Sequence, residues 1–293
     1  LEAARACGQR GLEVVLAEAG EAWGGRALKE SRLPGLASWG RVKDWRLGQL
    51  HKLPNVEMYL ASPLTADDIL SYGIGQVAVA TGATWRRDGV GRTRFTALES
   101  AAPTAVFTPD DFLGAGTALD HLPAGPIVVY DDEGYVMGGV LAELIARRGH
   151  AVTYVTPLEL VSYWTHHALD QSFIHRRLAD CGVTIELNRE LTGHSEDSVD
   201  LACAFTGAPS QRDCAALVLV TARLPNEQLY LDLKAREAEW ADAGIASVTA
   251  IGDCRAPATL AAAVYAGHRY AREFGETIDP DAVPFRREAI MTV

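Results

Sequence analysis

Short apolar runs alternate with longer amphipathic segments along the chain, in the order typical of α/β proteins with mainly parallel sheets. The runs predict strands at residues 13–18, 56–60, 76–80, 127–130, 151–155, 183–187, 217–221 and 248–253. The amphipathic segments predict helices at residues 1–10, 39–50, 136–148, 170–180 and 259–274, and a further helix that starts at 65–70. A less regular segment, 199–205, is expected to pair with the strand at 183–187.

This order predicts an α/β fold with two Rossmann-like domains of FAD- or NAD(P)-binding type, the second inserted in the first. We expect the first domain to comprise residues 1–122 and 217–293, and the second to comprise residues 123–216. The strand at 217–221 is expected to return the chain to the first domain. The 293 residues are 48% hydrophobic, which suffices for two cores.

The N-terminal segment has the pattern of the second half of a βαβ dinucleotide-binding unit. The helix at 1–10 ends at Gly11, and the strand that follows closes on an acid, Glu18. In such units a Gly-rich turn precedes the helix, and the acid accepts hydrogen bonds from a ribose diol. We therefore expect the first strand and its Gly-rich turn to lie immediately before Leu1. The alternative is that Glu18 is a surface acid at a strand end.

A glycine turn follows Glu18 after a few residues. Gly24 and Gly25 let a backbone approach phosphate closely, and Arg26 places a guanidinium beside it. The alternative is an ordinary glycine turn with a solvated arginine. Because the turn follows an acid-terminated strand, we expect it to belong to a nucleotide site.

Two other candidate positions follow predicted strands. Thr81 and Gly82 come after the strand at 76–80, at the end where ligands of open α/β sheets bind. Gly252 and Asp253 follow the last strand and precede a helix, whose first N–H groups favour an anion. Asp253 is expected to hold a ribose or ribityl hydroxyl, the alternative being that it only caps the helix.

The second domain carries acids where a NAD(P)-binding domain carries glycines. Asp131, Asp132 and Glu133 follow the strand at 127–130, at the turn where a nicotinamide dinucleotide would place its pyrophosphate. Like charges repel the pyrophosphate. We therefore expect this domain to be retained for structure and not to bind NAD(P)H.

Composition excludes several classes of protein. A net charge of −11 argues against nucleic-acid binding, which needs clustered Lys and Arg. No apolar run approaches the ~20 residues of a membrane span. The five cysteines form no C-x-x-C pair, and neither they nor the histidines have metal-ligand spacing. We expect no metal site, no redox-active disulfide and a reduced, cytoplasmic location.

Taken together, these motifs resemble the C-terminal part of the trimethylamine/dimethylamine dehydrogenase family, which includes histamine dehydrogenase and related amine N-demethylases. More distant relatives are 2,4-dienoyl-CoA reductase and other flavoproteins built on an Old Yellow Enzyme barrel. The resemblance covers most of the chain, through LEAARACGQRG (1–11), WGGR (23–26), LPGL (33–36), LTADDIL (64–70), VAVATGATWRRDG (77–89), MGGVLAELIARRGHAVTYVT (137–156), LVLVTARLPN (217–226), IGDCRAP (251–257) and AAAVYAGHRYARE (261–273).

The resemblance implies a set of cofactors. Such enzymes carry an upstream barrel with FMN, where the amine is oxidised, and a 4Fe–4S cluster near its end. The first dinucleotide-like domain holds ADP in the dehydrogenase branch and FAD in the dienoyl-CoA reductase branch. By matching position, the nucleotide-binding roles fall to Glu18, Gly24, Gly25, Arg26, Thr81, Gly82, Gly252 and Asp253. No catalytic residue carries over, because those motifs belong to the barrel.

The expected function is therefore the nucleotide-binding part of an oxidoreductase that resembles amine dehydrogenases or N-demethylases. The resemblance implies the upstream FMN barrel as a partner within the chain, an acceptor similar to electron-transfer flavoprotein, and a homo-oligomer. One alternative is an FAD-dependent, NAD(P)H-oxidising reductase domain of 2,4-dienoyl-CoA reductase type. Another is a non-catalytic docking module for an electron-transfer partner. The acidic turn at 131–133 favours the amine-dehydrogenase branch.

Overall fold

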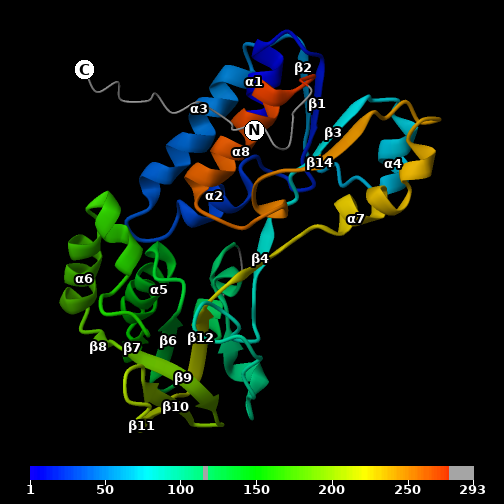
Figure 1. Cartoon of the computed structure of the whole chain (residues 1–293). Helices are drawn as coiled ribbons and strands as arrows, with labels where there is room; N and C mark the ends of the chain where they lie inside the picture. Colours follow the sequence, from blue (N-terminus) through cyan, green and yellow to red (C-terminus); the bar gives the residue numbers. More distant parts are fainter. Residues whose placement is uncertain (115–117, 277–293) are drawn as a thin grey trace, which may run out of the picture.

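The computed structural model describes residues 1–114 and 118–276. Two α/β units lie one above the other in Figure 1, and two crossing segments connect them. The crossings are β4 (Ala83–Trp85) and β13 (Arg223–Pro225), which pair antiparallel as a short ribbon. The prediction of an α/β protein is confirmed, and in this topology the strands of the second unit come between β3 and β14 of the first.

The first unit contains two separate parallel strand pairs. β1 (Val14–Ala17) pairs with β2 (Val56–Tyr59), and β3 (Gln76–Val79) pairs with β14 (Ser247–Ala250). The helices of this unit are α1 (Glu2–Gln9), α2 (Gly25–Glu30), α3 (Gly40–Leu50), α4 (Ala66–Ser71), α7 (Gln228–Ala235) and α8 (Leu260–Glu273). Thr65 caps α4, since its hydroxyl accepts a hydrogen bond from the Asp68 N–H.

Close helix packing explains the small residues of the N-terminal segment. A Cβ at Gly8 of α1 would lie 2.5 Å from Cγ2 of Val56 in β2, and one at Gly267 of α8 would lie 3.0 Å from the Ala3 nitrogen. Any larger side chain would therefore push α1 away from its neighbours. α1 packs against β1, β2 and α8, and α8 also contacts η7.

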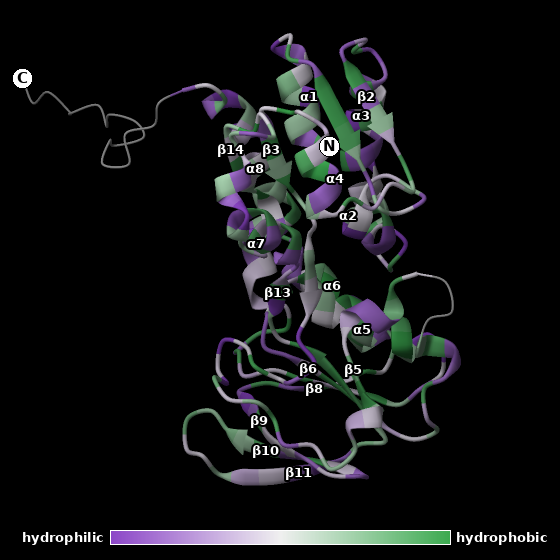
Figure 2. Cartoon of the chain, turned by 90° about the vertical axis from the view of Figure 1, so that its right-hand side faces the viewer, coloured by the Kyte–Doolittle hydropathy of each residue, from purple (hydrophilic) through white to green (hydrophobic). Residues whose placement is uncertain are grey.

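The second unit is built on a five-stranded parallel sheet of order β5-β12-β6-β7-β8. Its strands are β5 (Val106–Phe107), β12 (Ala216–Val220), β6 (Ile127–Asp131), β7 (Val152–Val155) and β8 (Thr184–Glu186). Its helices are α5 (Val136–Ala146) and α6 (Gln171–Asp180). An antiparallel sheet of β9 (Arg189–His194), β10 (Ser198–Cys203) and β11 (Pro209–Asp213) covers the side away from the first unit (Figures 1 and 2).

Short 3-10 helices join these elements. They are η1 (Ala37–Trp39), η2 (Pro103–Ala105), η3 (Pro109–Phe112), η4 (Ala118–Asp120), η5 (Tyr163–Ala168), η6 (Glu237–Glu239) and η7 (Gly252–Cys254). No helix in the two described ranges is long and apolar enough to span a membrane.

Two predicted strand placements are wrong. The strand at 217–221 does not return to the first unit, because β12 pairs with β6 and β5 within the second sheet. All five of its residues are buried, as expected of a strand with both faces covered. The chain returns to the first unit at β13. The segment 199–205 pairs with the polar strand β9 and with β11, not with 183–187, because short hairpins favour neighbours in sequence.

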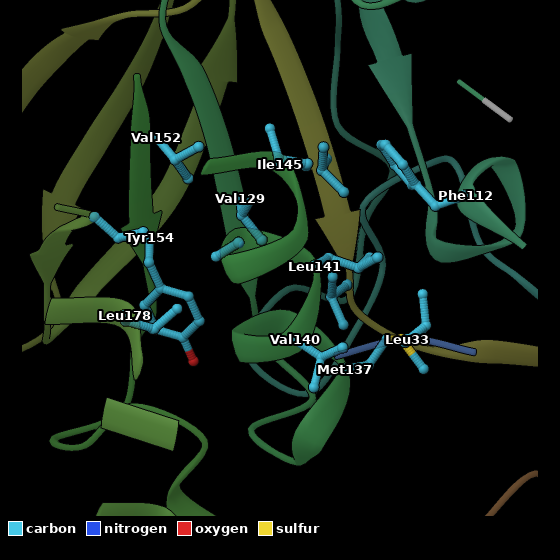
Figure 3. Packing of buried hydrophobic residues seen from close by; sticks show 14 of the residues in the cluster. Leu33, Phe112, Val129, Met137, Val140, Leu141, Ile145, Val152, Tyr154 and Leu178 are labelled. Carbon is cyan, nitrogen blue, oxygen red and sulfur yellow. The ribbon is translucent and has the colours of Figure 1, made fainter. Parts of the chain in front are cut away.

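The largest hydrophobic core lies in the second unit, around α5. Leu141 and Tyr154 are fully buried there (Figure 3). Leu33 and Leu36, which belong to the first unit, are buried in the same cluster, and Figure 3 shows Leu33 beside Met137 of α5. The two units therefore share part of one core, which opposes their separation.

Candidate functional site

One cleft of about 1910 Å³ extends from the strands of the first unit to the acidic turn of the second. This volume exceeds the ~300–1,000 Å³ typical of small-molecule sites, so the cleft has room for a long ligand. All eight residues predicted from the sequence line it: Glu18, Gly24, Gly25, Arg26, Thr81, Gly82, Gly252 and Asp253.

The topology explains why residues so distant in sequence meet. Glu18 follows β1, Thr81 comes two residues after β3, and Gly252 comes two residues after β14. These strands belong to parallel pairs, and the carboxyl ends of parallel strands meet at one edge of the sheet. The cleft lies at that edge.

Glu18 is held in place through its backbone and keeps part of its carboxylate free. Its N–H donates to the Tyr59 carbonyl at 2.9 Å, and its Oε1 accepts from the Gly20 N–H at 2.8 Å. Within the described ranges, Oε2 accepts no hydrogen bond. A fixed carboxylate with a free oxygen at the cleft wall is suited to accept from a ribose hydroxyl.

The glycine turn has a clear steric cause. Gly24 has a φ of +109°, and a Cβ there would lie 2.6 Å from Cδ of Lys43 on α3. Gly25 has a φ of +50° with open space around it, so a ligand can approach its backbone.

Arg26 lines the cleft, but internal partners bind its guanidinium. Nη1 lies 2.9 Å from Oε1 of Glu30, and Nη2 lies 2.9 Å from Oδ1 of Asp110. The guanidinium also lies 5.6 Å from the centroid of Trp85. Arg26 is therefore not the solvated arginine of the alternative interpretation, and its place beside a phosphate stays a prediction.

Thr81 and Gly82 join the end of β3 to the returning chain. The Thr81 hydroxyl donates to the Asn226 carbonyl and lies 3.2 Å from the buried Cys254 sulfur. Gly82 has a φ of +80°, with no atom within 4 Å of a Cβ position. The bend that Gly82 permits turns the chain from β3 toward the second unit.

The structure argues against one of the two interpretations of Asp253, that it caps α8. Thr259 is the N-cap of α8, accepting from the Ala262 N–H at 3.3 Å, so Asp253 does not cap that helix. Its Oδ1 accepts from the Ala258 N–H at 3.1 Å, and its Oδ2 lies 3.0 Å from Nη1 of Arg223. Asp253 therefore shapes the loop that enters α8, and Gly252, with a φ of +60°, starts that loop.

Arg223 is a cleft residue that the sequence did not single out. It follows β12 closely, so the same carboxyl-end rule would have found it had the 217–221 strand been placed in the second sheet. Its guanidinium lies 5.2 Å from the Trp85 centroid, so arginines 26 and 223 both contact that indole.

The acidic turn differs from the expectation that three carboxylates face a ligand. Asp131 is fully buried: its Oδ2 accepts from the Tyr154 hydroxyl at 2.6 Å and its Oδ1 from the Gly134 N–H at 2.8 Å. Asp132 is also buried and accepts from the backbone N–H and the hydroxyl of Thr93, each at 3.0 Å. Only Glu133 lines the cleft.

Burial governs the protonation of this turn. It raises the pKa of Asp131 to about 6, partly opposed by the hydrogen bond from Tyr154. Burial also raises the pKa of Glu133 to about 7, partly opposed by the Arg223 charge, and it raises the pKa of Asp132. The turn is thus a buried structural element that carries a proton at moderately acidic pH.

The raised pKa of Asp131 leads to a prediction about the stability of the fold. The folded protein holds the proton on this carboxyl up to a pH near 6, whereas an unfolded chain releases it near 3.8. The free energy of unfolding should therefore fall as pH rises through this interval, by at most about 3 kcal/mol at ~1.4 kcal/mol per pKa unit. Asp131→Asn should reduce this slope in denaturant titrations, and Asp242→Asn, at an exposed position, should not. Equal slopes for both variants would contradict the assignment.

Within the part of the chain that the structure describes, no group of three or more His, Cys, Asp or Glu residues is placed to hold a metal ion.

Comparisons with known proteins show which proteins this chain resembles. No family model matches the chain. Dimethylamine dehydrogenase of Hyphomicrobium sp. (strain x) is 31% identical over 98% of this chain and 42% of its own. The structure of histamine dehydrogenase from Rhizobium sp. 4-9 has a TM-score of 0.93 at 46% identity, over 98% of this chain and 44% of its own. That of 6-hydroxypseudooxynicotine amine oxidase from Pseudomonas geniculata N1 has a TM-score of 0.86 at 39% identity, over 94% of this chain and 40% of its own.

The fold also extends to more distant proteins. Thioredoxin reductase of Lactococcus lactis matches 93% of each chain with a TM-score of 0.59 at 15% identity, which shows the fold alone. The architecture thus resembles that of thioredoxin reductases. The chain belongs to the dimethylamine and histamine dehydrogenase family of Old Yellow Enzyme-related flavoproteins, as their C-terminal part. It spans about two fifths of the length of these relatives.

Proposed function

We propose that the cleft binds an adenine nucleotide, as FAD or ADP, within an oxidoreductase that acts on amines. The observation that carries this proposal is that the eight residues selected from the sequence line one cleft at the carboxyl ends of parallel strands. An adenosine ribose would be held by Glu18, and a diphosphate would lie toward Gly252 and the start of α8.

The residues present fit such a nucleotide. Glu18 Oε2 is free to accept a hydroxyl hydrogen, and the backbone at Gly25 and Gly82 is open to close approach. The 14-residue helix α8 directs its first N–H groups to this edge, where an anion is favoured. FAD would supply a flavin that exchanges electrons, whereas ADP would supply none, and both share the adenosine and diphosphate contacts.

We also propose that one parallel strand fills the slot between β1 and β3. Within the described ranges, each of these strands is paired on one edge only, and both face the same cleft. Val15 of β1 is 46% exposed, and Ala78 and Ala80 along β3 are exposed as well. A strand here would pair both free edges and bury this apolar surface. Its source would be the residues before Leu1, with the Gly-rich turn leading into α1.

For the complete protein, we propose an FMN barrel and a 4Fe–4S cluster upstream of this chain. The relatives that support this are named as a dimethylamine dehydrogenase, a histamine dehydrogenase and an amine oxidase. On this view the amine is oxidised outside the described chain, and the two units here form a scaffold beside the path to an acceptor similar to electron-transfer flavoprotein. A homo-oligomer and a cytoplasmic location are part of the same proposal.

The second unit should not bind NADPH or NADH. The pyrophosphate would need the space at the start of α5, where the Asp131 carboxylate lies so close that a Cβ at Gly138 would be 2.4 Å from its Cγ. Glu133 adds a like charge in the cleft when it is ionised, worth up to about 4 kcal/mol at ~4 Å and an effective dielectric near 20.

The test is anaerobic titration of the complete protein with NADPH, followed by flavin absorbance. We expect no saturable reduction. Rapid reduction that a substitution at Gly134 abolishes would instead support the reductase alternative.

The proposed nucleotide site is tested by calorimetric titration of nucleotide-free complete protein with ADP. Saturable binding of ADP that is weakened by substitutions at Glu18 and Gly252 would support the proposal. Absence of binding in a correctly folded protein would reject it.

A further inference from the structure

Arg223 closes a ring of hydrogen bonds around the loop that enters α8. Its Nη1 lies 3.0 Å from Oδ2 of Asp253, and its Nη2 donates to the Ala258 carbonyl at 2.9 Å. The third side of the ring is the 3.1 Å hydrogen bond from the Ala258 N–H to Oδ1 of Asp253. One guanidinium therefore fixes both ends of the segment between η7 and the Thr259 cap.

The second unit holds this guanidinium in turn. Oε1 of Glu133, on the acidic turn, lies 3.5 Å from Nη2 of Arg223, and the Trp85 ring lies 5.2 Å from it. The side chains are mostly buried, with exposed fractions of 11% for Arg223, 15% for Glu133 and 16% for Asp253. Such shielded contacts, made through two nitrogens of one planar guanidinium, fix geometry far better than an exposed pair does.

Arg223 also sits where the two units join. It is the first residue of β13, on the ribbon that runs between them in Figure 1. Its contacts reach the acidic turn of the second unit on one side and the loop of the first unit on the other.

We infer that Arg223 is a positioning residue, which holds the Gly252–Ala258 loop and the start of α8 in the geometry that receives the diphosphate of the nucleotide. The inference rests on the proposed nucleotide site and deepens it. Glu133 of the acidic turn helps to hold the Arg223 side chain in place. The second unit thereby contributes to binding in the first without holding a ligand of its own.

The test uses the nucleotide-free complete protein and two probes, ADP and adenosine, each measured by displacement of a fluorescent adenine nucleotide. Arg223→Met keeps an apolar stem against Trp85 and removes the hydrogen bonds. We expect it to raise the Kd for ADP about tenfold or more and to change the Kd for adenosine less than about twofold. Glu18→Ala should raise both, because Glu18 faces the ribose.

Two further variants separate positioning from general stability. Arg223→Lys keeps the charge but not the pair of hydrogen bonds, and it should raise the Kd for ADP above the wild-type value without changing that for adenosine. This result decides the matter if the Met variant fails to fold. Arg87→Met removes the 2.7 Å pair with Asp111, outside the cleft lining, and should change neither Kd.

An unchanged Kd for ADP, or equal changes for ADP and adenosine, in the Arg223 variants would overturn the inference while leaving the nucleotide site intact. A wild-type protein that binds neither probe would instead overturn the proposed site itself.

Discussion

A form of the protein that includes the residues preceding Leu1 is expected to bind ADP at least about 100-fold more tightly than a chain that begins at Leu1. The physical reason is the open slot between β1 and β3, whose facing edges are unpaired within the described ranges. Filling it would add a turn whose N–H groups reach the diphosphate. Hydrogen bonds to charged groups contribute about 1.5–3 kcal/mol each, so two of them give about this factor.

Calorimetric titration of both forms with ADP measures the difference, and thermal melts confirm that each form is folded. The extended form should also melt at a higher temperature, because the added strand buries the exposed Val15. Equal affinities in two folded forms would show that the slot has no part in binding.

In the complete protein, Glu18→Ala should weaken ADP binding by about 1–3 kcal/mol, which is about 5- to 150-fold. The structure leaves Oε2 of Glu18 free at the end of β1, so a ribose hydroxyl bound there would lose its partner in the variant.

The matched control is Glu21→Ala, which removes an exposed carboxylate three residues away, outside the cleft lining. We expect it to leave the Kd for ADP within about twofold of the wild type. If the two variants behaved alike, Glu18 would be only a surface acid at a strand end.

The sequence was sufficient to locate the cleft because of a topological rule. Residues such as Glu18, Thr81 and Gly252 each follow a recognisable apolar strand, and parallel strands bring their carboxyl ends together. Local patterns therefore sufficed to collect residues that are more than 200 positions apart, as Glu18 and Gly252 are.

Strand partners were harder to predict than strands. The run at 217–221 is apolar up to Thr221, which is equally compatible with either sheet, and only pairing with β6 places it in the second unit. The polar segment of β9 carries too weak an alternation to be recognised before its partners β10 and β11 are known. Arg223 escaped notice for the same reason.

The acidic turn shows a different limit. Charge alone suggested that Asp131 and Asp132 would face and repel a ligand, but burial and hydrogen bonding decide where a carboxylate points. Tyr154, which accounts for one of the Asp131 hydrogen bonds, lies 23 positions downstream on β7. A contact between neighbouring strands of this kind has no signature in the sequence of the turn itself.

The most direct test of the central claim is the adenine-nucleotide content of the complete protein. The purified protein would be denatured, and the released nucleotides would be separated by chromatography and quantified against the protein. The account predicts about one ADP or FAD per chain, with a lower content in the Glu18→Ala variant. A folded protein that releases no adenine nucleotide, and that takes up none when incubated with ADP or FAD, would contradict it.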